Sequence, residues 1–199
     1  RHNVTIKNVS ITGFENGIYL DSSSDNTVTN NTITNSEEPA VDLRNSSGNM
    51  IIGNNITGNR VWGVLLREYS SDNTIISNNV VNNIYGIGIE LRDSSSNTLR
   101  ENILVGNSFA VSGDSISDFI QNIDTSNMMD GKPIYYWVNR QNEQIPPNAG
   151  YVALINCTNI TVKDLILERY GDVTLWWTTN SRISNVSASC GIYFHYSIN

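Results

Sequence analysis

Short runs of alternating apolar and polar residues recur along the chain and predict β-strands. The runs "GIYLDSSS" from Gly17, "GVLLREYSS" from Gly63 and "GIGIELRDSSS" from Gly86 each begin with glycine and are rich in aliphatic residues. Alternation with a period of two over a few residues is typical of a strand with one buried face. No stretch has a sustained helical period, so the sequence predicts an all-β protein.

These runs belong to a repeat of about 23 residues. Asparagine follows each serine-rich stretch at Asn26, Asn49, Asn73 and Asn97, with spacings of 23, 24 and 24 residues. We align Asn3, Asn159 and Asn180 with this anchor position. A second position, five residues later, holds Asn8, Asn31, Asn54, Asn78, Asn102, Asp164 and Asn185.

A fixed period with several short strands per turn predicts a solenoid, in which each strand pairs in parallel with its counterpart one turn away. We expect a right-handed, single-stranded parallel β-helix with about 23 residues per turn and one long insertion. The handedness follows the general rule for parallel crossovers. Asparagine tolerates the left-handed backbone region, and its amide bonds well to its own copy in the next turn. We therefore interpret the anchor asparagines as structural corner residues.

The repeat is interrupted between residues 108 and 158, which include two aromatic-rich runs and Pro146-Pro147. We therefore expect β-helix turns over 1–107, an insertion or irregular turn packed on the solenoid over 108–158, and further turns over 159–199. These segments form one continuous domain, and we expect it to be part of a longer solenoid. Excursions from a repeat often carry function, and a rigid flap is the equally weighted alternative.

The composition of the chain argues against several classes of partner. The 199-residue chain has a formal net charge of −7, which argues against nucleic acid and against an anionic membrane face as partners. No apolar run is long enough to span a bilayer, so we expect no membrane insertion in this segment. Two cysteines, Cys157 and Cys190, do not make a disulfide framework, although one bridge between them stays open.

Eight asparagines stand in Asn-x-Ser/Thr sequons, the acceptor motif for N-glycosylation: Asn3, Asn8, Asn30, Asn45, Asn55, Asn156, Asn159 and Asn185. Only 16% of residues are charged, and amide and hydroxyl side chains are abundant. Both features favour an extracellular, cell-surface or periplasmic location over a cytosolic one.

The segments "NTVTNNTITN", "VDLRNSSGN" and "NTIISNNVVNNIYGIGIELRDSSSN" resemble the NosD-like repeats, a family also described as the carbohydrate-binding and sugar-hydrolase (CASH) β-helix group. The segment from Asn122 to Leu167 is similar to an insertion of archaeal surface proteins in this family. The resemblance implies a right-handed parallel β-helix, an exported setting, and relatives that bind or process polysaccharides. It also carries a copper association, but His2, His195 and the pair Met128-Met129 are isolated, whereas copper sites need clustered soft ligands.

Alignment of the turns brings charged residues into columns. Asp21, Arg44, Arg67 and Arg92 share one column, and Asp42, Leu65 and Glu90 share another. Two carboxylates two strands apart are about 10 Å from each other, near the upper limit for an inverting glycosidase pair. Asp42 and Glu90 are thus the candidate catalytic residues, with Arg67 and Arg92 as candidate substrate-binding residues. The alternative is a solvated face kept soluble by mixed charges.

Aromatic residues precede the turn glycine at Trp62 and Tyr85, and exposed rings at a corner suit stacking against sugars. Trp62 and Tyr85 are therefore candidate binding residues. Further aromatic candidates, for which core packing is the alternative, are Tyr135, Tyr136, Trp137, Tyr170, Trp176 and Trp177. We expect no cofactor and no protein metal site, with calcium at Asp114, Asp118, Asp124 and Asp130 as the one candidate ion.

The sequence thus predicts an extracytoplasmic module for recognition or scaffolding at the cell envelope, with a glycan or other envelope proteins as partners. A polysaccharide-acting enzyme, either a hydrolase, a lyase or an epimerase, is the alternative. A purely structural spacer in a surface layer is the second alternative.

Overall fold

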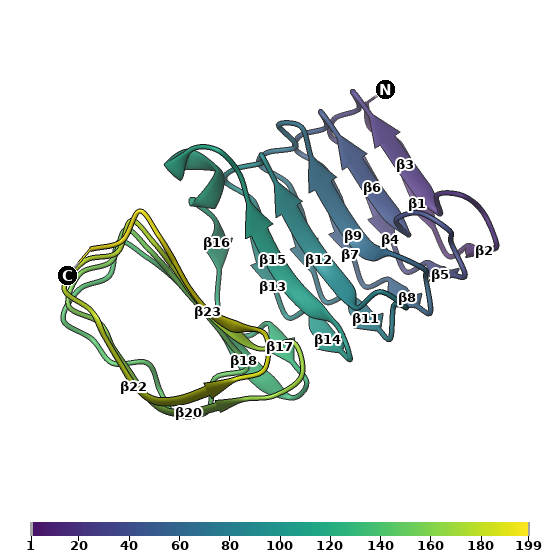
Figure 1. The fold of residues 1–199 in the computed structure, drawn as a ribbon. Helices are drawn as coiled ribbons and strands as arrows, with labels where there is room; N and C mark the ends of the chain where they lie inside the picture. Colours follow the sequence, from purple (N-terminus) through teal and green to yellow (C-terminus); the bar gives the residue numbers. More distant parts are fainter. Residues whose placement is uncertain (1, 199) are drawn as a thin grey trace.

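The fold consists of two stacks of short parallel strands that meet at an angle (Figure 1). The structure is a computed structural model that describes residues 2–198. Within that range it contains strands β1 to β23 and one 3-10 turn, η1 (Ile116–Phe119), and no α-helix. The predicted all-β parallel solenoid is therefore confirmed. No helix in the described part of the chain has the length and apolar character needed to cross a membrane.

Three sheets form the first stack, because each coil contributes one strand to each sheet. The first sheet contains β1 (Thr5–Lys7), β4 (Thr27–Thr29), β7 (Met50–Ile52), β10 (Thr74–Ile76), β13 (Thr98–Arg100) and β16 (Asn122–Ile123). The second contains β2 (Ser10–Thr12), β5 (Thr32–Thr34), β8 (Asn55–Thr57), β11 (Asn79–Val81), β14 (Ile103–Val105) and β17 (Met128–Met129). The third contains β3 (Ile18–Asp21), β6 (Val41–Arg44), β9 (Trp62–Arg67), β12 (Ile87–Arg92) and β15 (Ser108–Ser112).

The second stack begins where the chain reverses direction at Asp130 and Gly131. Both residues have positive φ, and β17 pairs with β18 antiparallel across this turn. One sheet of the stack contains β18 (Lys132–Val138), β19 (Tyr151–Ile155), β21 (Asp172–Trp176) and β23 (Gly191–His195), all parallel. A second sheet contains β20 (Thr161–Leu167) and β22 (Arg182–Ala188). Figure 1 shows the second stack nearly end-on and the first from the side, so the two do not share an axis.

The irregular region at residues 108–158 therefore spans the junction between the stacks. Its first strands, β15, β16 and β17, complete the first stack, and β18 and β19 begin the second. The interruption of the repeat marks a change of coil axis.

Apolar side chains fill the interior of the first stack in columns, one from each of the first two sheets and two from the third. The short strands each point one residue inward. The completely buried ones include Val28, Ile51 and Ile75 in the first sheet and Ile33, Ile56 and Val80 in the second. Full burial of such a side chain stabilises the fold by about 1.5–3 kcal/mol relative to exposure. Period-two alternation is maintained because one coil's inward residue stacks on the next coil's.

Asparagine ladders close the corners between the sheets. In each, the side-chain carbonyl of one coil accepts hydrogen bonds from both the backbone N–H and the side-chain amide of the preceding coil; Asn54 thus donates to Asn78 Oδ1 at 3.0 and 2.9 Å. The ladders are Asn26–Asn49–Asn73–Asn97, Asn31–Asn54–Asn78–Asn102–Asn127 and Asn59–Asn83–Asn107. The third ladder was not predicted, although its asparagines follow the second at the same five-residue spacing.

The left-handed corner residue and the ladder residue are neighbours, and this corrects the sequence interpretation. Asp25, Asp72 and Ser96 have φ near +57°, and each immediately precedes a ladder asparagine. Asn3 and Asn8 pair with Asp25 and Asn30 in the register of β1 with β4, so they are corner residues one position before the predicted ladder. The corner role and the ladder role fall on different residues for a physical reason. The left-handed residue turns the chain outward, and the side chain of the next residue then points into the corner.

The second stack replaces the asparagine ladder with smaller side chains. Asn159 and Asn180 have positive φ and are corner residues, as predicted, and Asn159 Nδ2 donates to Asn142 Oδ1 at 2.8 Å at an exposed position outside the inner bonding. The inner bonds come from Thr178, whose Oγ1 accepts from Cys157 N at 3.2 Å, and from Ser197, whose Oγ accepts from Thr178 N at 3.1 Å. Cys157 is buried and Cys190 exposed, and both are free thiols, so the open disulfide does not form.

Aromatic side chains seal the first stack against the second. Phe109 of β15 makes edge-to-face contacts with Tyr136 and Tyr151, with ring centroids 6.4 and 5.4 Å apart. The Tyr136 hydroxyl donates to the carbonyl of Phe119 at 2.7 Å. The second stack thus acts as a lid on the open end of the first core.

The ladder geometry predicts a sharp contrast between two adjacent residues. Asn78→Ala removes the acceptor of two buried Asn54 donors, each of which costs about 1–3 kcal/mol when left unsatisfied. We expect a loss of roughly 4 kcal/mol in the free energy of unfolding. Asn79→Ala removes one exposed bond to Asn55 and is expected to cost about 0.5 kcal/mol or less. Urea denaturation followed by circular dichroism measures both, and equal losses would contradict the structural role of the ladder.

Candidate functional site

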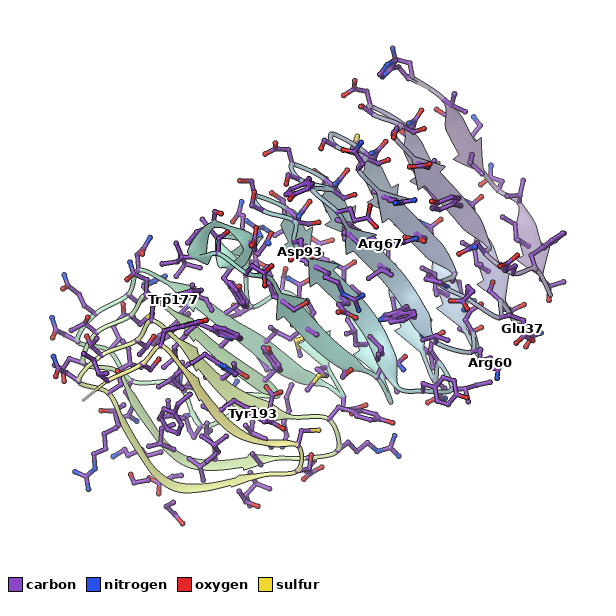
Figure 2. All side chains as sticks on the ribbon, turned by 45° about the horizontal axis from the view of Figure 1, so that its top comes forward. Glu37, Arg60, Arg67, Asp93, Trp177 and Tyr193 are labelled. Atoms are coloured by element: carbon purple, nitrogen blue, oxygen red, sulfur yellow. The ribbon has the colours of Figure 1, made fainter. Side chains whose placement is uncertain are left out.

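The outward face of the third sheet carries the charged columns expected from sequence. Asp42 pairs with Leu65, which pairs with Glu90, and Arg44 pairs with Arg67. Although these side chains point away from the core, Asp42 is only 2% exposed, Leu65 3% and Glu90 8%. The face therefore has a packed outer layer of side chains, and Figure 2 shows the position of Arg67 in the first stack.

A hollow of about 420 Å³ lies on this face. Four of the candidate residues, Asp42, Trp62, Arg67 and Arg92, line it. The remaining lining residues are Glu15, Asn16, Tyr19, Glu38, Pro39 and Leu65. The structure thus brings most of the candidate residues together, in strands β3, β6, β9 and β12 and the corners before them.

Asp42 and Arg67 form a bidentate ion pair across neighbouring coils. Arg67 donates from Nε to Oδ1 at 3.1 Å and from Nη2 to Oδ2 at 3.0 Å. The hydrogen bond to Asp42 raises the pKa of Arg67 further above its usual range. Arg67 Nη1 also donates to Glu68 at 3.3 Å, and Glu68 accepts from Arg44 at 2.7 Å. Both carboxylate oxygens of Asp42 are therefore engaged.

Glu90 organises the other half of the hollow. Its Oε2 accepts from Trp62 Nε1 at 2.6 Å, and its Oε1 accepts from Arg92 Nε and Nη2 at 3.0 and 2.9 Å. Arg92 also lies over the Trp62 ring, with its Cζ atom 5.8 Å from the ring centroid. In this arrangement Glu90 holds the indole and the guanidinium in place. The two candidate acids thus orient binding groups, and neither presents a free carboxylate to the hollow.

Tyr85 lies outside this hollow. It is 61% exposed at the corner between the second and third sheets, beside a separate hollow of about 310 Å³. Arg60 lies 6.0 Å above the Tyr85 ring and pairs with Glu37 at 2.6 Å, which raises the pKa of Arg60. Figure 2 shows Glu37 and Arg60 together at that corner.

The other aromatic candidates are buried or partly buried. Tyr135 and Tyr136 are buried, which favours the core-packing alternative for both. Tyr170 covers Gly86, where the Cβ of any larger residue would lie 2.7 Å from the tyrosine ring. Trp176 stacks on His195 with ring centroids 3.8 Å apart, and Trp177 stacks on Tyr196 with ring centroids 5.2 Å apart. Trp177 and Tyr193 mark this aromatic surface of the second stack in Figure 2.

Sequence reasoning missed the corner residues Glu15, Asn16 and Glu38, and Tyr19 of β3, which pairs with Asp42; together they complete the hollow. Glu15 and Glu38 lie on adjacent coils, since Glu38 N donates to the Glu15 carbonyl at 2.7 Å. Glu15 and Glu38 lie just before strands of the third sheet, at positions similar to that of Trp62 in its own coil. This similarity in the repeat could have identified them as residues of the hollow. Asn16 Oδ1 is buried and has no hydrogen-bond donor among the described residues.

The acidic residues proposed for calcium do not converge. Asp124 pairs with Arg100 at 2.9 Å, Asp118 accepts from Ser115, and Asp130 accepts from Gly106 N at 2.8 Å. Partial burial, and then the nearby Asp114 and Asp118, raise the pKa of Asp93. Within residues 2–198, no three His, Cys, Asp or Glu side chains are grouped as metal ligands. Calcium therefore stays a sequence-based prediction without a ligand set.

Asp172 is the most perturbed carboxyl group. It begins β21, where burial raises its pKa to about 7, and the one hydrogen bond that opposes the shift comes from Thr174 Oγ1 at 3.3 Å. Its charge adds to the burial that raises the pKa of Tyr151 in the neighbouring strand. A group with this pKa changes charge near neutral pH.

Comparison with known proteins supports the fold. A family model described as a right-handed β-helix region matches residues 1–149, about three quarters of the chain. A search of curated proteins finds no match.

The Asp42–Arg67 pair is expected to show strong coupling. Arg67→Ala leaves a buried carboxylate without its partner, so we expect a loss of about 2–3 kcal/mol, reduced from the fully buried case because Arg67 is partly exposed. The double variant Asp42→Ala/Arg67→Ala should lose less than the sum of the single variants. A double-mutant cycle of unfolding free energies measures the coupling, and strict additivity would show that the pair is not an energetic unit.

The raised pKa of Asp172 predicts a pH-dependent stability. Below about pH 4 the group is protonated in both states, and between about pH 4 and 7 only the unfolded state ionises, so stability falls as pH rises. The full shift corresponds to about 4 kcal/mol, and we expect roughly half of this after allowance for partial exposure. Asp172→Asn should gain that much relative to the parent between pH 4 and 8. Parallel profiles of unfolding free energy against pH would contradict the assignment.

Proposed function

The chain belongs to the right-handed β-helix family, and from this premise we propose that it is a glycan-recognition module of the cell envelope. The glycan binds on the third sheet, in the hollow that contains Trp62. The observation that carries the proposal is the fixed position of the Trp62 indole, whose N–H is bound by Glu90 beside Arg92. A ring held in place loses little entropy when a sugar stacks on it, and this favours recognition.

The polar groups of the hollow support the same proposal. Arg67 and Arg92 are each held by a carboxylate of the same sheet, so their donors keep a defined direction. An apolar ring bordered by oriented donors and acceptors is the usual composition of a small polar-ligand site.

An extracytoplasmic setting is supported by the asparagine distribution. The eight sequon asparagines are all exposed, and seven of them, every one except Asn55, have positive φ. Ladder asparagines, such as Asn49 and Asn54, are buried and lie outside sequons. In the first two ladders of the first stack the fold explains this segregation, because the residue two positions after a ladder asparagine is an inward apolar residue, as Ile51 is after Asn49. The exposed sites are open to glycosylation, and the resemblance to NosD-like repeats of surface proteins points the same way.

Recognition is favoured over catalysis by the state of the candidate acids. A general acid or base needs a carboxyl oxygen within reach of the substrate. Asp42 uses both oxygens to hold Arg67, and Glu90 uses both to hold Trp62 and Arg92. The polysaccharide-acting enzyme therefore remains the less favoured alternative, and the structural spacer is the outcome if no glycan binds.

The proposal predicts that binding depends on Trp62. The parent protein is titrated calorimetrically against a panel of oligosaccharides, while released reducing ends are measured in the same mixtures. We expect saturable binding without turnover. Trp62→Ala should weaken binding about five- to tenfold, because a stacked ring contributes on the order of 1–1.5 kcal/mol.

Trp137→Ala is the matched control. Trp137 lies in β18 of the second stack and also has an arginine, Arg140, 5.8 Å from its ring centroid. Its loss should leave binding unchanged. Trp62→Phe keeps a ring without the N–H bond to Glu90 and should bind with intermediate affinity. Equal binding by the parent and Trp62→Ala would eliminate this hollow as the site, and turnover would favour the enzyme.

A further inference from the structure

We propose that the hollow on the third sheet selects neutral oligosaccharides and rejects glycans built from uronic acids. The inference rests on the proposed glycan-binding function and specifies its ligand class. It follows from the charge balance of the lining and from the kind of hydrogen-bonding groups left without partners.

The arginines of the hollow are already neutralised. Arg67 forms its bidentate pair with Asp42, and Arg92 donates twice to Glu90. Arginine recognises an acidic ligand through a free guanidinium fork. Here the Nε–Nη2 edges of both guanidinium groups face protein carboxylates. A ligand carboxylate would have to share or displace those partners.

Two further carboxylates, Glu15 and Glu38, lie at the rim without compensation. Both are exposed, and neither forms an ion pair within the described part of the chain. They occupy adjacent coils, because Glu38 N donates to the Glu15 carbonyl. With Asp42 they make three lining carboxylates against the two guanidinium groups of Arg67 and Arg92. The hollow thus carries an excess of negative charge, in a chain whose formal net charge is −7.

The lining and the rim contain acceptors that lack donors among the described residues. Asn16 Oδ1 is buried in the lining without a donor, and the Glu15 and Glu38 carboxylates accept only. Sugar hydroxyls supply donors to such groups, whereas an ionised carboxylate supplies none. Trp62, Leu65 and Pro39 add apolar surface for the face of a sugar ring. Hydroxyl donors together with an uncharged ring face define a neutral sugar.

The test compares hexasaccharides in pairs that share ring configuration: glucan with glucuronan, mannan with mannuronan, and galactan with galacturonan. A glucosamine hexamer is the cationic arm. We expect at least one neutral member to bind the parent protein at least ten times more tightly than its uronic partner at low ionic strength. Added salt should reduce the difference in affinity between the neutral and the uronic hexasaccharide, because salt screens the exposed charges at the rim.

In the double variant Glu15→Gln/Glu38→Gln, the affinity for the uronic hexasaccharide should come within about threefold of the affinity for its neutral partner. The reason is that the variant removes the repulsion between the rim carboxylates and the ligand carboxylates. The control variant Glu101→Gln/Asp164→Asn removes the same formal charge at exposed positions outside the third sheet and should leave the ratio unchanged. A shift of equal size in the control would assign selectivity to overall charge and overturn the inference.

Each remaining outcome is decisive. Uronic binding equal to or tighter than neutral binding overturns the inference and leaves glycan recognition standing. Tighter binding of the glucosamine hexamer than of every neutral sugar also overturns it, in favour of cation selection by Glu15 and Glu38. Binding of no glycan by the parent overturns the proposed function and the inference together.

Discussion

The first stack depends on how its corners satisfy buried backbone groups. A chain that turns three times per coil leaves N–H and C=O groups in the corners, and a buried group of this kind is costly when unpaired. The asparagine side chain solves this because it has an acceptor for the coil before and donors for neighbouring carbonyls, as Asn78 does with Asn54, Asn102 and Ile51. The same residue type recurs at the same place in each coil because the same bonds must be made again.

This requirement also fixes the candidate site. Coils locked by ladders stack in register, and side chains on the outer face therefore form straight columns. The column of Asp42, Leu65 and Glu90 lies beside that of Arg44 and Arg67 for this reason alone. Ion pairs between columns then hold the outer layer at a density that buries two carboxylates on a nominally exposed sheet. A rigid scaffold thus gives the hollow its preformed shape.

Sequence periodicity predicts the fold and the register of the third sheet, because both follow from residues that repeat. It fails where the geometry depends on one-residue offsets, as with Asn3, which the repeat placed in the ladder and the structure places in the corner. It also fails for contacts between side chains. Arg67 could have faced solvent, and its pairing with Asp42 depends on side-chain rotamers that no column reveals. The turns over 159–199 were predicted, but the inner bonding of the second stack was not, because Cys157, Thr178 and Ser197 make these bonds without a shared residue type.

The equivalence of successive coils has a consequence for how such a protein changes over evolutionary time. Each ladder rung makes the same bonds to the rung before and the rung after, so a duplicated or deleted coil meets compatible neighbours on both sides. The contacts of Phe109 with Tyr136 and Tyr151 join the end of the first stack to the second, so they do not depend on the number of coils before them. Lineages could therefore lengthen or shorten the outer face by whole coils, and the size of the ligand it accommodates would change in steps of one coil.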